Sequence, residues 1–352
     1  MTQELIHPAS PATMSRSSAP SIQAPSPIAR IETNWGRVSV KAKHYRWPVQ
    51  SSRSREVRRR HCATATPASH RWGLVLAGAD GVRLREPSQN VWGADRPKQS
   101  CPLFESRTLL EETRRRAERS VSPEQILYSV TQGHEHYYLP SLADRPSQRI
   151  VQPSDKGTAP AILSALIQIA QRDPNAVVVI LPCDHPHSPE SAVTTALESA
   201  FEIAERRSRF VVLLGVEPKS PSWIEVVKTI SSHSGFAMVG HICTLLELAW
   251  AAVPSLLQLL ESPEIASSAS GEIRIPRAIY DRIDSTDFSR QVLSAATDRL
   301  LALRLPNVEW SDVGDRNPAL VKLLEQNATP PVWPSSALIH RLYLGGPLAA
   351  RA

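Results

Sequence analysis

The sequence predicts an α/β protein with a mixed, mostly parallel sheet flanked by helices. Short apolar runs alternate with amphipathic segments between residues 72 and 215. The run at 176–181 is continuously apolar and mostly β-branched, which is typical of a strand covered on both faces. The segment at 159–172 repeats its apolar residues at helical spacing. Strands that alternate with helices in this way indicate a parallel sheet with helices on both sides.

The expected elements follow from these patterns in chain order. Leu109, Leu110 and Thr113 are expected on the inner face of the helix at 106–119, and Arg114 to Arg116 largely outside. Beyond residue 215 the alternation stops, and a Ser-rich linker occupies 262–271. Strands are expected at 72–77, 125–131, 149–152, 176–181, 210–214 and 301–305, and helices at 106–119, 159–172, 189–206, 244–260, 276–283 and 288–296.

Composition divides the chain into three parts. Residues 1–71 hold 12 Lys and Arg against 3 acids, so the rest carries −3 of the total +6. Their Ser, Pro, Ala and Arg content predicts a disordered basic leader, because it buries too little apolar surface to offset chain entropy. The alternatives for this leader are an arm that binds nucleic acid or another polyanion and, as a minor option, a transit peptide. A folded domain is expected at 72–326, and an irregular tail at 327–352.

The chain's location is inferred from two features. The four cysteines, Cys62, Cys101, Cys183 and Cys243, lie far apart and form no CxxC pair. No apolar run approaches the ~20 residues of a membrane helix, and the start of the chain lacks the apolar core of a secretory signal. A cytoplasmic protein without a membrane partner is expected. The mildly acidic body gives no electrostatic reason to bind nucleic acid.

A glycine-bearing loop follows the first expected strand. It reads Leu76-Ala77-Gly78-Ala79-Asp80-Gly81, with Arg83 and Lys98 soon after. Glycines at such a place let backbone N–H groups approach phosphate oxygens, and nearby cations neutralise phosphate charge. The loop has neither the GxxxxGK[ST] nor the GxGxxG pattern. On these residues alone, a triphosphate-binding loop and an ordinary strand-to-helix turn are both open.

Further polar residues follow other strands. Gln152 leads through Gly157 into a helix, where unpaired N–H groups suit a nucleobase edge or an anion; a capped tight turn is the alternative. Asp184 directly follows the strand at 176–181, and Asp312 lies in Trp310-Ser311-Asp312-Val313-Gly314. Ligands of such sheets bind at the carboxyl ends of strands, and Mg²⁺ commonly takes one or two carboxylates. Both acids are therefore candidate metal ligands, although Asp184 as a helix cap or loop hydrogen-bond acceptor is the alternative.

Taken in order, these segments resemble the mannose-1-phosphate guanylyltransferase family of sugar nucleotidyltransferases. The similarity spans about residues 72–324. The matched segments are Ala77-Gly78-Ala79-Asp80-Gly81-Val82-Arg83-Leu84, Pro97-Lys98-Gln99, Cys101-Pro102-Leu103-Phe104, Gln152-Pro153, Gly157-Thr158-Ala159-Pro160-Ala161, Pro182-Cys183-Asp184-His185, Gly215-Val216-Glu217-Pro218, Met238-Val239-Gly240, Asp287-Phe288-Ser289 and Trp310-Ser311-Asp312-Val313-Gly314-Asp315.

The resemblance implies a Rossmann-like nucleotidyltransferase fold and a reaction. GMP would pass from GTP to mannose 1-phosphate, or to a related hexose 1-phosphate, giving GDP-mannose and pyrophosphate. Arg83, Lys98 and Asp184 are the implied catalytic residues, and Asp184 with Asp312 would hold the cofactor Mg²⁺. The implied nucleotide-binding residues are Leu76, Ala77, Gly78, Ala79, Gly81, Gln152, Gly157, Thr158 and Ala159, and the implied substrate residues are Glu225 and His233.

The chain departs from the family pattern within the glycine loop, shortly after it, and around 219–235. Ala79 replaces a glycine of the loop, and Glu86 stands where the family has no acid. Around 219–235, some tens of family residues have no counterpart, including a lysine expected at the sugar phosphate. The alternative function is therefore a catalytically impaired homologue that binds nucleotide but lacks a complete sugar-phosphate site.

Overall fold

The computed structural model describes residues 5–6, 69–79, 97–100, 102–104, 107–183, 190–215, 235–265 and 271–304. The chain divides into two units, one made of Met1–Ile6 with Arg71–Ala352 and the other of His7–His70. All described residues except Ser69 and His70 belong to the first unit.

A nine-stranded sheet runs through this unit. Seven of its strands run in one direction, and only β9 and β1 run against their neighbours. The predicted mixed, mostly parallel sheet is confirmed. From edge to edge the strands are β1 (Leu5–Ile6), β11 (Leu300–Arg304), β8 (Val211–Gly215), β9 (Gly235–His241), β7 (Val177–Pro182), β2 (Arg71–Leu76), β5 (Ile126–Thr131), β6 (Arg149–Gln152) and β10 (Ile273–Arg274).

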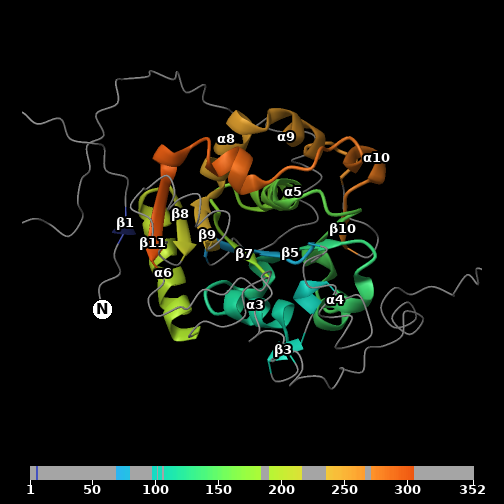
Figure 1. Cartoon of the computed structure of the whole chain (residues 1–352), viewed down its shortest axis with the longest axis horizontal. Coiled ribbons are helices and arrows are strands. Elements are labelled where there is room, and N and C mark those ends of the chain that lie inside the picture. The colour runs from blue at the N-terminus through green and yellow to red at the C-terminus, as the bar shows by residue number, and fades with distance from the viewer. Residues whose placement is uncertain are drawn as a thin grey trace, which may run out of the picture. The chain divides into compact units, whose positions relative to one another are not determined.

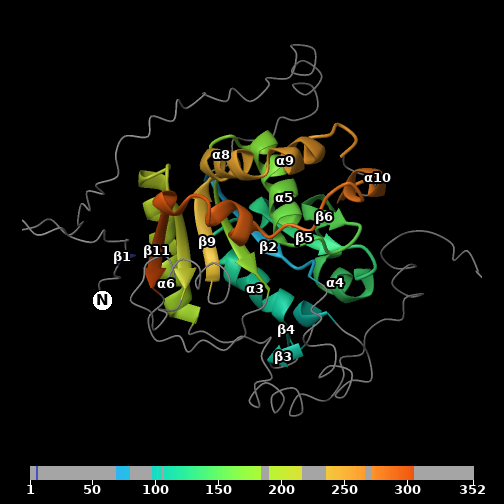
Figure 2. The same cartoon turned by 45° about the horizontal axis from the view of Figure 1, so that its top comes forward.

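Helices cover both faces of the sheet (Figures 1 and 2). One face carries α3 (Leu109–Glu118), α4 (Glu135–Leu142) and α6 (Glu190–Arg206), and the other carries α5 (Thr158–Arg172), α8 (Ile242–Ala252) and α9 (Pro254–Leu260). The short helix α10 (Arg277–Tyr280) follows β10, and the short strands β3 (Pro102–Phe104) and β4 (Arg107–Thr108) form a separate pair.

Local sequence explains where several elements begin and what they bury. In α5, Ile162, Leu163, Leu166 and Ile169 are each at most 1% exposed, as their helical spacing predicts. Helix α3 begins at a capping box, in which the Glu111 N–H donates to the Thr108 hydroxyl and the Thr108 N–H donates to the Glu111 carboxylate. Such caps satisfy backbone donors that the first turn leaves unpaired.

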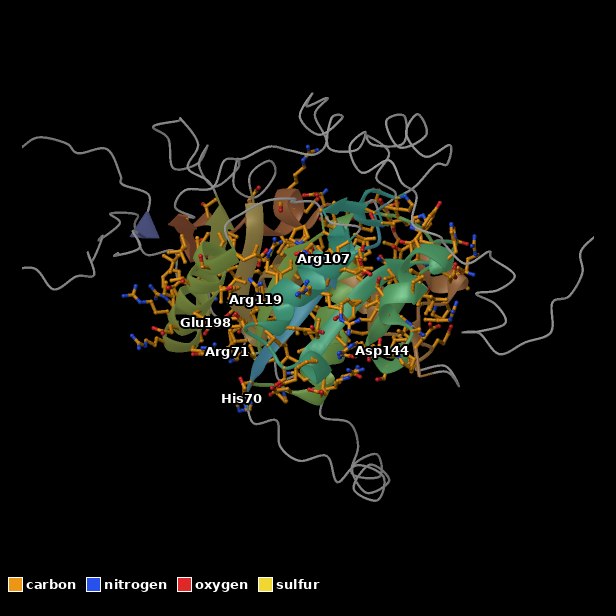
Figure 3. The ribbon with its side chains drawn as sticks, turned by 90° about the horizontal axis from the view of Figure 1, so that it is seen from below. His70, Arg71, Arg107, Arg119, Asp144 and Glu198 are labelled. Atoms are coloured by element: carbon orange, nitrogen blue, oxygen red, sulfur yellow. The ribbon has the colours of Figure 1, made fainter. Side chains whose placement is uncertain are left out.

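Arg71 fastens the amino end of β2 to helix α6. Its guanidinium lies 2.5 Å from a Glu198 carboxylate oxygen and 2.7 Å from one of Glu205, and it sits over the Phe201 ring. Figure 3 shows Arg71 beside Glu198. Hydrogen bonding to Glu205 and Glu198 raises the pKa of the guanidinium despite its partial burial. This contact lies at the amino ends of the parallel strands, because Arg71 is the first residue of β2.

The predicted helix at 244–260 is wrong in one respect, because the structure has two helices there. The chain bends by 119° between α8 and α9, at Val253. Pro254 is the cause, since proline has no N–H to continue the helical ladder and is well placed to start a new one. Within the described residues, no single helix is long and apolar enough to cross a membrane.

Four other expectations differ from the structure. Arg116 is only 2% exposed rather than outside, because it pairs with Glu190 of α6 at 3.0 Å. Strand β9 and helix α4 were not expected, and the predicted helix at 288–296 is a single π-type turn, Ser289–Leu293. Leu5 and Ile6, in the predicted leader, pair with β11 at the edge of the sheet. Most of that leader, and the predicted tail at 327–352, lie outside the described residues.

Candidate functional site

The candidate site lies where β2, β5, β6 and β7 end. These strands are parallel, so their carboxyl ends meet at one edge. The Ala77 N–H donates to the Ser129 carbonyl at 2.8 Å, and the Cys183 N–H donates to the Leu76 carbonyl at 3.2 Å. The start of the glycine-bearing loop is therefore held between the ends of β5 and β7.

Three consecutive carbonyl groups of this loop accept hydrogen bonds from buried side chains. The Gln99 amide nitrogen donates to Ala77 O at 2.8 Å and to Ala79 O at 2.9 Å. The Thr131 hydroxyl donates to Gly78 O at 2.6 Å. A Cβ on Gly78 would lie 3.0 Å from both the Gln152 amide nitrogen and the Thr131 hydroxyl, so glycine permits this close packing.

Gln152, at the end of β6, lies beside the same loop and bonds residues outside it. Its amide nitrogen donates to the Ser129 hydroxyl at 2.8 Å, and its amide oxygen accepts from the Tyr280 hydroxyl at 2.7 Å. Burial, followed by the nearby Asp155 charge, raises the pKa of the Tyr280 phenol, which keeps it protonated and able to donate. Gln152 was predicted to bind nucleotide, but its side chain is 3% exposed and both its ends have protein partners.

The turn into α5 interlocks with the segment around Thr286. The Ala159 N–H donates to Thr286 O at 3.0 Å, and the Thr286 N–H donates to Lys156 O at 2.9 Å. Gly157 has φ +89° and ψ −179°, and a Cβ there would lie 2.5 Å from Thr286 O. The expectation of an unpaired N–H group at this helix start is therefore wrong for Ala159.

Side chains complete the interlock. The Lys156 ammonium donates to the carbonyls of Tyr280, Asp281 and Ile283 at 2.9, 3.1 and 2.6 Å. The Thr158 hydroxyl donates to the Asp287 carboxylate at 3.1 Å and accepts from the Phe288 N–H at 2.8 Å. The three hydrogens of the ammonium and the Thr158 hydroxyl are thus engaged with the segment 280–288.

The structure brings together seven of the residues predicted to bind nucleotide. They lie at the ends of β2 and β6 and at the start of α5: Leu76, Ala77, Gly78, Gln152, Gly157, Thr158 and Ala159, with Ala79 exposed at the loop's last described position. The other predicted residues, Gly81, Arg83, Asp184, Glu225, His233 and Asp312, lie outside the described residues. Lys98 begins a short 3₁₀ turn, Lys98–Ser100, directly before Gln99.

The predicted metal site fits the described strand ends in one respect. Cys183 adjoins Leu76 through its N–H, and Asp184 is the next residue in the sequence. Among the residues that the structure describes, no three His, Cys, Asp or Glu side chains group closely enough to hold a metal ion. Magnesium binding by Asp184 and Asp312 stays a prediction.

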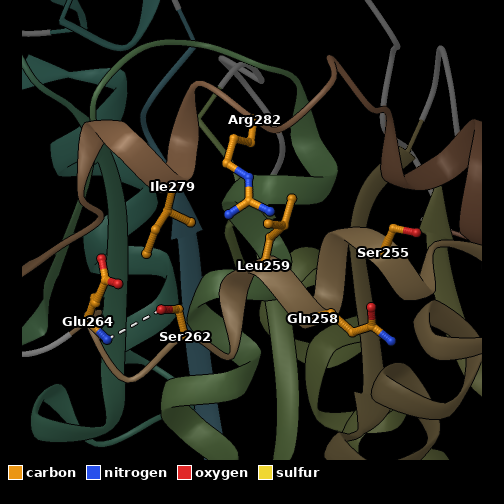
Figure 4. Close-up of a pocket in the computed structure, with 7 residues that line it drawn as sticks. All are labelled: Ser255, Gln258, Leu259, Ser262, Glu264, Ile279 and Arg282. Carbon is orange, nitrogen blue, oxygen red and sulfur yellow. Dashed lines mark hydrogen bonds between the residues drawn. The ribbon is translucent and has the colours of Figure 1, made fainter.

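A hollow of about 470 Å³ lies elsewhere, between α9 and the α10 region (Figure 4). The Arg282 guanidinium points into it. None of the predicted site residues lines it. Its lining residues are Ser255, Gln258, Leu259, Ser262, Glu264, Ile279 and Arg282.

Four residues that shape the site at the strand ends, Gln99, Thr131, Tyr280 and Thr286, were not predicted to take part in it. Gln99 belongs to the matched Pro97-Lys98-Gln99 segment, so its motif was a usable signal. Thr131 ends a predicted strand, and a hydroxyl at a strand end is only a weak indication that the residue takes part in a site. Tyr280 and Thr286 carried none, because their partners lie more than 120 residues away in sequence.

Fold and site together define a Rossmann-like α/β protein with a glycine loop and a helix start at the carboxyl ends of its strands. Within that class, the chain belongs to the family defined by the MobA-like NTP transferase domain, whose sequence profile matches residues 73–261. It is thus a nucleotidyltransferase by family.

Named relatives agree with the resemblance to mannose-1-phosphate guanylyltransferases. The xanthan biosynthesis protein XanB of Xanthomonas campestris pv. campestris (strain B100) is 28% identical over 153 residues, which are 42% of this chain and 31% of that protein. A mannose-1-phosphate guanylyltransferase of Escherichia coli is 27% identical over 182 residues, 49% of this chain and 38% of that protein. The chain thus spans about a third of the length of these relatives.

Solved structures support the fold. The mannose-1-phosphate geranyltransferase of Thermus thermophilus superposes with a TM-score of 0.55 at 25% identity, covering 70% of this chain and 77% of that one. The mannose-6-phosphate isomerase of Helicobacter pylori gives 0.52 at 18% identity, covering 68% and 99%, and is similar in fold alone.

Proposed function

We propose that this chain transfers GMP from GTP to mannose 1-phosphate or a related hexose 1-phosphate. A phosphate oxygen of the sugar phosphate attacks the α-phosphorus of GTP. The bond from that phosphorus to the oxygen bridging to the β-phosphate breaks, and pyrophosphate leaves with the electron pair. The observation that carries the proposal is the glycine loop 76–79, braced at the carboxyl edge beside Cys183, after which Asp184 follows.

The residues divide by the part of the substrate they would meet. Backbone N–H groups of the loop, continued by Gly81, would bind the triphosphate, and Arg83 and Lys98 would neutralise its charge. Asp184 and Asp312 would hold Mg²⁺, which supplies charge stabilisation on the phosphates when bound. Glu225 and His233 are proposed for the sugar side. Positioning and charge stabilisation dominate phosphorus displacement, so the proposal requires no general base.

The second candidate is a homologue that binds nucleotide with little or no turnover. One observation favours it. The Gln152 amide, the Thr158 hydroxyl and the Ala159 N–H, all predicted to bind nucleotide, have protein partners instead. A site that keeps the loop but uses these groups for packing offers fewer contacts to hold the base and ribose.

Two measurements separate these candidates. Calorimetric titration with GTP and Mg²⁺ tests nucleotide binding, and pyrophosphate release with mannose 1-phosphate tests turnover. Binding with turnover supports the transferase, and binding without turnover supports the second candidate. Absence of GTP binding contradicts both.

A variant pair tests the metal carboxylate. Asp184→Asn should abolish turnover while leaving the fold intact. Asp298→Asn is the control, because Asp298 is exposed in a 3₁₀ turn before the amino end of β11. Equal turnover of the two variants would remove Asp184 from the mechanism.

A further inference from the structure

We propose that Gln99 is the residue that positions the phosphate-binding loop. By donating from one amide nitrogen to two loop carbonyls, it fixes the direction of the peptide groups that meet the triphosphate. The inference rests on the proposed function, since it takes a nucleoside triphosphate to bind at this loop.

The geometry is specific. The Gln99 nitrogen has two hydrogens, and its two acceptors, Ala77 O at 2.8 Å and Ala79 O at 2.9 Å, lie on either side of Gly78. Thr131 holds the Gly78 carbonyl between them at 2.6 Å. The Gln99 side chain is 5% exposed, so water competes little for these acceptors.

Holding a carbonyl also sets an N–H direction. A trans peptide is planar, and its C=O and the following N–H point to opposite sides. With Ala77 O held by Gln99, the Gly78 N–H is directed away from Gln99. With Gly78 O held by Thr131, the Ala79 N–H is directed away from Thr131. Oriented backbone N–H groups are what anion-binding loops use, and fixing them before the ligand arrives avoids reorganisation.

The chain contains a matched control for this contact. Gln148 is 6% exposed, and its amide nitrogen also donates to two backbone carbonyls, Ile126 O at 2.6 Å and Pro123 O. Ile126 is the first residue of β5, so this contact lies at the amino ends of the parallel strands, whereas the loop 76–79 lies at their carboxyl ends. Replacing either glutamine by methionine removes two hydrogen bonds from an amide nitrogen to backbone carbonyls and preserves side-chain length. Gln148→Met also removes the hydrogen bond that the Gln148 amide oxygen accepts from Arg145 at 3.3 Å, so the control loses at least as much local bonding as Gln99→Met.

The test compares full-length wild type, Gln99→Met and Gln148→Met by calorimetric titration with GTP, GDP and GMP, each with Mg²⁺. We expect Gln99→Met to weaken GTP binding at least about tenfold and GMP binding less than about threefold, because the loop meets the outer phosphates. We expect Gln148→Met to change all three affinities by less than about twofold. If Gln99 had a purely structural role, Gln99→Met would weaken the binding of GTP, GDP and GMP by the same factor.

The outcomes are distinguishable. Gln99→Met that loses GTP and GMP affinity equally, or that matches Gln148→Met, overturns the positioning role while the proposed function stands. Wild type that binds no guanine nucleotide overturns the proposed function and this inference together. If circular dichroism shows that Gln99→Met does not fold, Gln99→Asn, whose amide is one methylene shorter, takes its place under the same criteria.

Discussion

Substituting Gly157, a half-buried residue directly before α5, by alanine is expected to destabilise the protein strongly. The new methyl group would lie 2.5 Å from the Thr286 carbonyl oxygen and 3.0 Å from its carbon. Both are backbone atoms, so no side-chain rotation relieves the contact. Either the turn into α5 or the segment at Thr286 must move.

The magnitude follows from two contributions. The φ and ψ of Gly157, +89° and −179°, lie in a region essentially restricted to glycine, and alanine there costs about 1–3 kcal/mol. Moving Thr286 weakens two backbone hydrogen bonds, with Ala159 and Lys156, at ~0.5–1.5 kcal/mol each. The free energy of unfolding should therefore fall by roughly 2–6 kcal/mol, and the melting temperature by at least about 4 °C.

Gly133→Ala is the matched control. Gly133 also has positive φ, +92°, but a Cβ there meets nothing within 4 Å. Its substitution carries the conformational cost alone. Urea unfolding of the two variants compares a positive-φ glycine packed against Thr286 with one that is not, and the difference is expected at about 1–3 kcal/mol. Gly157→Ala no less stable than Gly133→Ala would refute the reasoning.

Three further expectations concern buried polar groups. Asp173→Ala leaves the Trp72 indole N–H without its partner at 3.0 Å, and urea unfolding should show a loss of about 1–3 kcal/mol; an unchanged midpoint contradicts this. Arg149→Met removes a partner of the Glu272 carboxylate, whose side chain is 1% exposed, and should lower the free energy of unfolding by about 3–5 kcal/mol. Adding Glu272→Met should recover most of this loss, whereas additive losses would argue against a buried charge as the cause. Burial raises the Tyr280 pKa above the value of about 10 in the unfolded chain, so the folded state keeps a proton that the unfolded state releases, and stability falls as pH rises above about 10. Tyr280→Phe should lower that slope, and a tyrosinate absorbance titration in which Tyr280 ionises before unfolding contradicts it.

The sequence was sufficient for the elements whose burial is periodic or continuous. Strand β7 is a continuous apolar run, and α5 repeats its apolar residues at helical spacing, so both were predicted within a residue or two. Strand β9 was not, because Gly235 and Gly240 weaken its strand pattern, and its burial comes from lying between β7 and β8. The burial of Arg116 likewise depends on Glu190, which is 74 residues away.

Two of the predicted site segments lie together at the carboxyl ends of the strands, although side chains in one of them have protein partners. The loop 76–79 and the turn at 157–159 lie at the carboxyl edge, because parallel strands put their ends together whatever their sequence separation. The interlock with 280–288 could not be predicted, since it depends on contacts between segments about 125 residues apart. Nothing in the spacing of Lys156 indicated that its ammonium would meet three carbonyls.

A nucleotide site contains residues that touch the ligand and residues that hold those in place, and a sequence motif does not separate them. Gln152 and Thr158 match the family pattern, yet the polar groups of both side chains bond other parts of the protein. The Gln152 amide oxygen accepts from Tyr280, and the Thr158 hydroxyl bonds Asp287 and Phe288. Within the described residues, this shifts the expected ligand contacts from side chains to the backbone of 76–79. A loop that binds phosphate through its backbone N–H groups depends on the residues that fix the direction of its peptide groups. In the loop 76–79 these residues are Gln99 and Thr131, which donate hydrogen bonds to its carbonyls.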